Sequence, residues 1–390
     1  MKPLNLLQFL PFWAGTSLLF GIGCGQAVFA QSPTLHLQTS PPLQQVIPTH
    51  EPVQVSLQAL DGTGRSLSNT RIRLQLLTPA PSPWLSTDFP WVEGTTLIEL
   101  ETLAPKGQLT FSQTLPIRGS YRLKADVAPT GEATFAPFSQ TLTLDVPENP
   151  IKYRNVALLL AILLLTGCAG GWAMGTRAQR QDGEIAPQRV RLMLSGATLM
   201  AIAALLYVNI SAEMASHHDH SPMEMEDHHA HQSAPTPATQ TVNGIRASLS
   251  GEQFAKVGQL AEQRLRIADA VSGRGVSNVA VTLRAIGLEH NEEIFAYSTQ
   301  PNAQGEVVWS QQFFDGAPHI VEAEIAPLPG ATQSFKPFKV AQQIDVEALE
   351  PPLTTRLITL GYFTAFFVAG LGLGLKLRQG NSRSMLSAKL

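Results

Sequence analysis

Residues 121–127 read Tyr-Arg-Leu-Lys-Ala-Asp-Val, so an uncharged side chain alternates with a charged one along the whole stretch. Alternation with a period of two is typical of a β-strand that has one face in a core and the other in water. The same pattern recurs nearby, at residues 35–37, 52–58, 72–76, 96–100, 109–111 and 141–146. Seven short strands in about 110 residues predict a β-sandwich of the immunoglobulin-like kind.

A second copy of this unit follows later in the chain. Residues 107–113 (Gly-Gln-Leu-Thr-Phe-Ser-Gln) align with residues 305–311 (Gly-Glu-Val-Val-Trp-Ser-Gln), an offset of 198. This offset holds as far as Pro129 and Pro327, and the alignment resumes after a two-residue insertion. Collinear matches with one small gap indicate a duplication. The sequence therefore predicts two tandem immunoglobulin-like β-sandwiches, over residues 31–150 and 243–350.

The chain is also rich in long apolar segments. Only 15% of its 390 residues are charged, against roughly 25% in an average soluble domain. Residues 156–176, 192–210 and 357–375 contain no charged side chain, and helices of these lengths can cross a bilayer core. We expect three transmembrane helices, which gives a fold class of mainly β exported domains plus transmembrane α-helices. Small residues spaced about four apart let two helices approach closely. The glycines with such spacing are Gly171 and Gly175 in the first segment and Gly370, Gly372 and Gly374 in the third.

Basic residues beside the apolar segments set the expected orientation. The loop 177–191 and the tail 376–390 each carry four Lys or Arg residues, and such segments stay in the cytoplasm. Both sandwiches are acidic and are therefore expected on the periplasmic or extracytoplasmic side. Residues 1–30 resemble a signal peptide ending at Ala30, although their long apolar stretch also fits an uncleaved signal anchor.

One dense group of metal-ligating side chains stands out, in the linker 211–242 that follows the second predicted span. Six of the ten histidines lie there, interleaved with methionine and acidic residues. Imidazole binds divalent transition metals, thioether sulfur prefers Cu(I), and carboxylates offset the charge of the cation. We expect a transition-metal site, with copper favoured and zinc or nickel as alternatives, formed by His217, His218, Asp219, His220, Met223, Met225, His228, His229 and His231.

Two plainer interpretations of this segment, hereafter the His/Met segment, stay open. It can be a polar flexible linker, because residues 233–240 continue as a Pro, Thr and Ala spacer. It can also sense pH, because six histidines titrate together near neutrality. The isolated His290 and His319 in the second sandwich are expected to be ordinary surface residues and not ligands.

The sequence excludes several classes of function. We find no His-Glu-x-x-His, Gly-x-Ser-x-Gly, phosphate-loop or Cys-x-x-Cys motif, so we expect no enzyme. A net charge of −3 argues against nucleic acid as a partner. The resulting hypothesis is a membrane-anchored envelope protein that captures or buffers a metal and passes it to a membrane partner, either a transporter or a metalloenzyme under assembly. The alternatives are a scaffold or assembly subunit, or an accessory subunit of a metal transporter.

Overall fold

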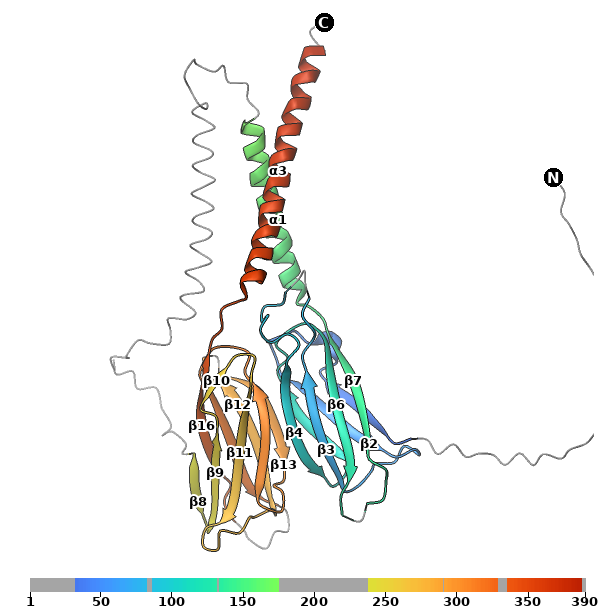
Figure 1. The fold of residues 1–390 in the computed structure, drawn as a ribbon, viewed down its shortest axis with the longest axis vertical. Coiled ribbons are helices and arrows are strands. Elements are labelled where there is room, and N and C mark those ends of the chain that lie inside the picture. Colours follow the sequence, from blue (N-terminus) through green and yellow to red (C-terminus); the bar gives the residue numbers. More distant parts are fainter. Residues whose placement is uncertain are drawn as a thin grey trace, which may run out of the picture.

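The computed structural model describes residues 32–82, 86–131, 133–174, 238–289, 291–328 and 335–387. Within them, two layers of β-sheet form an elongated body, and two long helices leave one end of it and cross (Figure 1). We call this end of the β-body the helix end. The structure is therefore mainly β with two apolar helices, in agreement with the predicted class.

The first module contains all seven strands that the alternation predicts. Their bounds are β1 Thr34–Ser40, β2 Val53–Leu60, β3 Thr70–Leu77, β4 Thr96–Ala104, β5 Gln108–Gln113, β6 Gly119–Pro129 and β7 Phe138–Val146, with one short 3-10 helix, η1, at Leu43–Gln45. Strands β1, β2 and β5 form one layer, and β7, β6, β3 and β4 form the other. This division into three and four strands is an immunoglobulin-like sandwich.

The second module repeats this plan. Its strands are β8 Thr239–Val242, β9 Ile245–Gly251, β10 Phe254–Lys256, β11 Leu260–Asp269, β12 Val279–Gly287, β13 Glu292–Thr299, β14 Glu306–Gln312, β15 His319–Pro327 and β16 Phe338–Glu347. Strand β14 takes the place that β5 has in the first module, and β13 takes that of β4. Strands at aligned sequence positions thus occupy equivalent places in the two modules.

The two modules are not separate sandwiches, because each layer runs through both. The strand orders are β1-β2-β5-β13-β12-β15-β16-β10 and β7-β6-β3-β4-β14-β11-β9-β8. In one layer Phe111 pairs with Tyr297, and in the other Trp309 pairs with Leu100. Phe111 and Trp309 are aligned residues, so the two junctions are related by an approximate two-fold axis. The sequence did not predict this joining of the modules.

Side chains reinforce both junctions. Thr102 and Thr299 place their hydroxyl oxygens 3.0 Å apart, and the side-chain amide of Gln312 donates to the Thr95 hydroxyl at 2.8 Å. At the helix end, the ring of Phe89 packs edge-on against that of Phe314 at 5.7 Å. One hydrophobic core runs through the whole body. The two modules therefore form one continuous body with a shared core.

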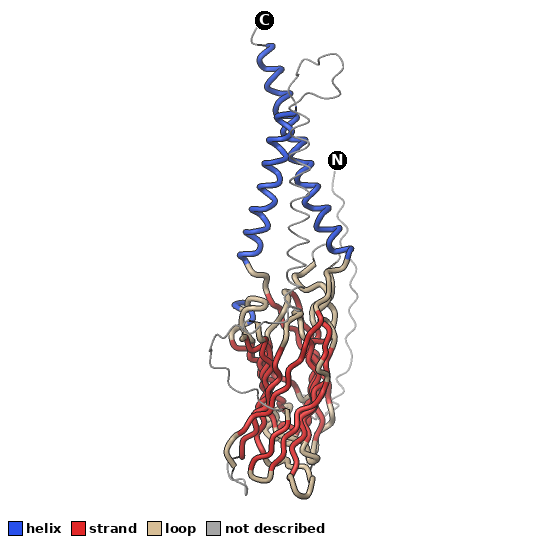
Figure 2. The backbone as a smooth tube through the Cα atoms, turned by 90° about the vertical axis from the view of Figure 1, so that its left-hand side faces the viewer, coloured by secondary structure: helices blue, strands red, loops and turns tan. Residues whose placement is uncertain are grey.

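The helices α1 Pro150–Met174 and α3 Leu353–Ser387 are both long and apolar enough to cross a membrane. They cross each other (Figure 2), and the contact is made at small residues. A Cβ added to Gly167 or Gly171 would overlap the backbone of α3, and one added to Gly370 or Gly374 would overlap that of α1. Two Gly-x-x-x-Gly motifs therefore face each other at the crossing.

The predicted glycine contacts are partly wrong. Gly167 was not among them although it lies in the contact, and Gly372 meets open space. Gly175 lies outside the described residues, as do the predicted span 192–210, the loop 177–191 and the leader. Helix α3 continues beyond the predicted span to Ser387, so part of the predicted tail is helical.

Short connections hold the helices to the β-body. Only residues 147–149 separate β7 from α1, and residues 348–352 separate β16 from α3. Lys152 in the first turn of α1 forms an ion pair with Asp88 at 2.6 Å, and Arg356 in α3 pairs with Glu350 at 2.7 Å. The helices are therefore closely tied to the body at both points of attachment.

Candidate functional site

All nine residues of the expected metal site, His217 to His231, lie outside the described residues. Their expected ligand role therefore stays a prediction. Among the residues that the structure does describe, no three His, Cys, Asp or Glu side chains come together in a way that could hold a metal ion. The described part of the chain instead offers a single buried histidine with an acidic neighbour.

That histidine is His319, the first residue of β15. Its side chain is fully buried, so the expectation that it is an ordinary surface residue is wrong. Its ring lies 4.7 Å from the ring of Phe313. Its Nδ1 lies 2.7 Å from the carbonyl oxygen of Ala317, which can only accept a hydrogen bond, so Nδ1 carries the proton. In a neutral imidazole, this bond places the free lone pair on Nε2.

The carboxylate of Asp315 lies next to that nitrogen. The Oδ1 atom of Asp315 is 3.1 Å from Nε2 of His319. Although this distance is short enough for an ion pair, the two atoms lack the directions that a hydrogen bond needs, and neither has another hydrogen-bond partner in the described structure. The Asp315 side chain is 41% exposed, whereas its Oδ1 atom and the Nε2 atom of His319 are both buried.

The local sequence explains this placement. In β15, residues 319, 321, 323 and 325 point into the core and the residues between them are less buried. The inward phase of the strand therefore begins at His319. Across the sheet His319 pairs with Gly287 of β12, and even a Cβ added there would stay 3.8 Å from Nε2. The alternation of β15 was the sequence signal that could have identified His319 as buried.

We call the place where the loop before β6 or β15 enters its strand the corner of the module. The first module has a different arrangement at this corner. Tyr121 aligns with His319 and Ile117 with Asp315, both at the offset of 198. The Tyr121 hydroxyl donates to the carbonyl oxygen of Ile117 at 2.6 Å and accepts from its N–H at 2.9 Å. Burial raises the pKa of Tyr121 far above its ordinary value of 10, so this group stays neutral. It corresponds to the tyrosine corner of immunoglobulin-like domains.

A second place considered is a cavity of about 490 Å³ in the first module, also at the helix end. It is lined by Arg118, Arg122 and Glu93 among others. Arg118 forms an ion pair with Glu148, and the Glu93 carboxylate accepts from the Thr87 hydroxyl at 2.7 Å. Charges of both signs therefore line and border the cavity, and they do not favour one class of ligand.

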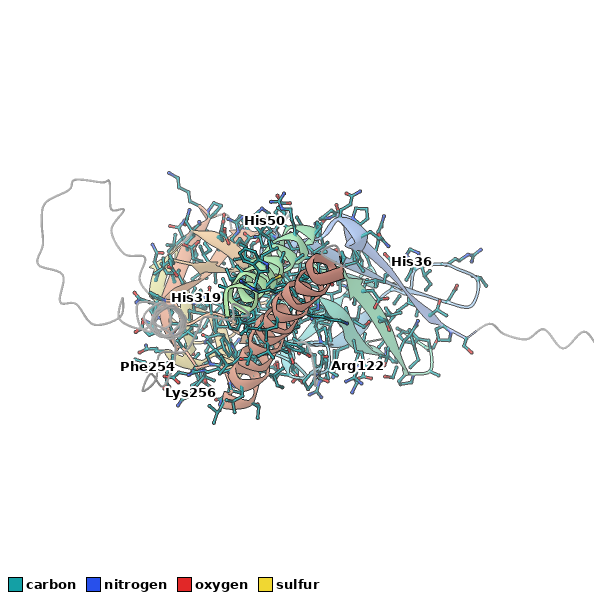
Figure 3. All side chains as sticks on the ribbon, turned by 90° about the horizontal axis from the view of Figure 1, so that it is seen from above. His36, His50, Arg122, Phe254, Lys256 and His319 are labelled. Carbon is teal, nitrogen blue, oxygen red and sulfur yellow. The ribbon has the colours of Figure 1, made fainter. Side chains whose placement is uncertain are left out.

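In the view from the helix end, His319 lies in the second module, well away from the exposed His36 at the edge of the first (Figure 3). Sequence motifs could not identify the pair His319 and Asp315, because a lone histidine four residues from an aspartate is common. Its distinguishing property is burial of the ring beside an unpaired carboxylate oxygen, which only the fold reveals.

Comparison with known proteins gives similarity of fold at a low level. No protein-family model and no curated protein matches the chain. A CARDB domain from Pyrococcus furiosus, solved in complex with di-metal ions, is similar over 27% of this chain and 94% of its own, with 13% identity and a TM-score of 0.19. FetP from uropathogenic E. coli is similar over 31% of this chain and 100% of its own, with 10% identity and a TM-score of 0.22.

Alpha-2-macroglobulin from E. coli is similar over 80% of this chain but only 16% of its own, with 11% identity and a TM-score of 0.21. At these identities and TM-scores the similarities carry no argument about function.

Proposed function

We propose that this chain is a membrane-anchored envelope protein that captures or buffers a transition metal and passes it to a membrane partner. The observation that carries the proposal is the His/Met segment, residues 217–231, with six histidines, two methionines and four acidic residues and no Lys or Arg. Donors of this kind satisfy the preferences of copper in both redox states, and zinc or nickel would need only the imidazoles and carboxylates.

The path of the described chain supports a location for this segment outside the membrane. Helix α1 leads away from the β-body, and the described chain resumes at Ala238, beside β8 on the body (Figure 1). The predicted span 192–210 lies between these two described parts in the sequence. His231 is seven residues from Ala238, which limits their separation to about 25 Å.

The β-body would give this segment a fixed platform. The connections to α1 and α3 are short, so a bilayer around these helices holds the helix end close to the lipid surface. An ion captured by the segment then stays near any membrane partner that lies beside the helices. Binding and transfer need no catalytic group, and we propose a carrier and not an enzyme.

The test replaces the six clustered histidines by Ala in the full-length protein. Metal content of protein purified from its native membrane, cellular metal tolerance and loading of metalloenzymes are measured. We expect bound metal to fall by several ions per chain and tolerance to drop. A matched control, His36→Ala with His50→Ala, removes two exposed histidines of the first module and should change neither. Unchanged tolerance and loading in the six-histidine variant would refute the proposed function.

One observation favours a second candidate, a structural scaffold in a membrane complex. The two modules form a single rigid body through two continuous sheets, which is a suitable platform for binding other proteins. Isolation of the complex after mild solubilisation separates the two candidates. A stable complex that survives both a chelator and the six-histidine replacement supports the scaffold, whereas a complex that needs the metal supports the carrier.

A further inference from the structure

We infer that His319 and Asp315 form a second metal site, in the β-body, which accepts a divalent cation such as Cu(II) through Nε2 of the imidazole and Oδ1 of the carboxylate. The inference deepens the proposed function and rests on it for the source of the ion. The His/Met segment would be the capture site, and this pair would be the acceptor site on the rigid part of the molecule.

The imidazole of His319 is oriented to bind a cation. Its Nδ1–H is held by the carbonyl oxygen of Ala317 at 2.7 Å, which fixes the tautomer and leaves a lone pair on Nε2. Metal-binding histidines in proteins almost always have their other ring nitrogen fixed in this way. Cation binding at Nε2 would therefore need no rotation of the ring.

The separation of the two donor atoms fits a shared metal ion. Nε2 and Oδ1 are 3.1 Å apart, buried, and without a hydrogen bond between them or to any other described group. Two ligand atoms bonded to one ion at about 2.0–2.1 Å and at roughly 100–110° are separated by about 3.1–3.4 Å. Two lone pairs facing each other without a proton or an ion between them would be unfavourable.

The duplicated module lacks these donor atoms at the aligned position. In the first module the aligned corner is closed by the Tyr121 hydroxyl, whose hydrogen bonds to Ile117 are both satisfied. The corner offers metal-binding atoms only in the second module, which is also the module that follows the His/Met segment in the chain. The frame of the sandwich does not require a histidine at this position, since the tyrosine closes the same corner.

The pair leaves coordination positions for water or for an incoming ligand. The Asp315 side chain is 41% exposed although its Oδ1 atom is buried, so an ion would enter past the exposed part of this side chain. A site with two protein ligands and open positions releases its ion more readily than a closed structural site with four. This property suits transfer of an ion and not permanent storage.

The experiment uses the full-length protein in detergent and Cu(II) as the probe. The background is a variant in which the nine ligand residues of the His/Met segment are replaced by Ala, so that only the β-body can bind. We expect this variant to retain one Cu(II) per chain at pH 7.5, with a single imidazole nitrogen in pulsed electron paramagnetic resonance. His319→Tyr, which restores the corner of the first module, should weaken binding at least tenfold, and Asp315→Asn should also weaken it.

The control in the same background is His36→Ala with His50→Ala, which should leave the bound ion and its nitrogen coupling unchanged. Circular dichroism checks that each variant is folded, and Asp315→Asn keeps the test valid if His319→Tyr does not fold. Retention of no Cu(II) in the segment variant would overturn the inference, and so would retention that His319→Tyr and Asp315→Asn leave unchanged. A pair that binds only a proton would give the first of these results.

The two proposals fail in different ways. Wild-type protein that binds several ions, combined with a segment variant that binds none, overturns the acceptor site and keeps the proposed function. A segment variant that still binds one ion at His319, combined with unchanged cellular metal tolerance, keeps the site and refutes the proposed function.

Discussion

The two modules share a seven-strand plan, to which the second module adds the edge strands β8 and β10, and they also differ at the helix end. Aligned residues Phe111 and Trp309 occupy equivalent core positions, and both are almost fully buried. The corner differs, with Tyr121 in one module and His319 in the other. The connection between the third and fourth strands of the sandwich also differs, since it covers residues 78–95 in the first module and only 288–291 in the second. The duplicated frame is thus retained for stability, whereas the helix end has diverged.

The largest expected effect tests whether the modules unfold together. Phe111→Ala or Trp309→Ala should each cost about 3–5 kcal/mol of unfolding free energy, because each removes a large buried side chain. Since both layers are continuous, each variant should lower the single transition of the whole β-body, measured by thermal circular dichroism in detergent. A variant in which one module unfolds while the other keeps its wild-type midpoint would contradict the single rigid body.

The next prediction compares the two corners. Tyr121→Phe leaves the buried N–H and carbonyl of Ile117 without a partner and should cost about 1–3 kcal/mol. His319→Phe should cost less, because only the bond to Ala317 is lost. Tyr153→Phe is the control, since Tyr153 is 63% exposed. Chemical denaturation measures all three, and an equal cost for Tyr121→Phe and Tyr153→Phe would show that the first corner contributes nothing.

A third prediction concerns the helix crossing. Gly171→Leu places a side chain where the backbone of α3 passes and should cost about 1–3 kcal/mol through overpacking. Gly170→Leu should have little effect, because a Cβ at Gly170 meets open space. Unfolding in mixed detergent micelles measures the difference between these adjacent positions. Similar behaviour of the two variants would mean that α1 and α3 do not pack through this face.

A smaller effect is expected at two aligned buried glutamines. Neither side-chain amide atom of Gln311 has a partner among the described residues, so Gln311→Leu should be neutral or stabilising by up to about 1 kcal/mol. Gln113 is different, because its side-chain amide donates to the carbonyl oxygen of Thr114 at 2.9 Å. Gln113→Leu should therefore give no gain. A cost for Gln311→Leu equal to that for Gln113→Leu would contradict the difference.

The smallest effect is a pH dependence of the unfolding free energy. It comes from two turns at the end of the β-body opposite the helix end. A hydrogen bond from the Thr63 hydroxyl lowers the pKa of Asp61 below its ordinary value of 3.8, and backbone N–H donation from Ser272 lowers the pKa of Asp269. A lowered pKa in the folded state gives stability that is present above pH 3.8 and is lost as the pH falls through the lowered pKa. Asp61→Asn and Asp269→Asn should each flatten the acid limb of the stability profile, and unchanged profiles would exclude these contributions.

The strands of the first module were predictable because alternation of apolar and polar side chains follows directly from one buried face. The joining of the modules was not, because the edges of β4 and β5 pair through backbone groups that every sequence possesses. Gly167 was also missed, because the glycine content of a helix does not show which of its sides faces a partner helix.

For the expected metal site, the sequence predicts the ligands but not the structure. Its residues could be proposed from composition, because six histidines within a short segment are unusual, but a segment of this kind carries no periodicity from which a fold follows. His319 is the reverse case, since its chemistry is ordinary in the sequence and becomes unusual only when β15 places the ring in the core. Composition found one candidate, and strand phase would have been needed to find the other.

The pairing of the two modules through β4 and β5 has a consequence for shortened forms of the protein. Strands β4 and β5 each use their outer edge to pair with the opposite module. A product that stops after α1 would leave these two rows of backbone donors and acceptors open, and exposed strand edges promote self-association. Two such fragments could satisfy each other through the same register and form a homodimer. Proteolytic loss of the C-terminal half would thus be expected to produce paired fragments or aggregates and not a soluble half-molecule.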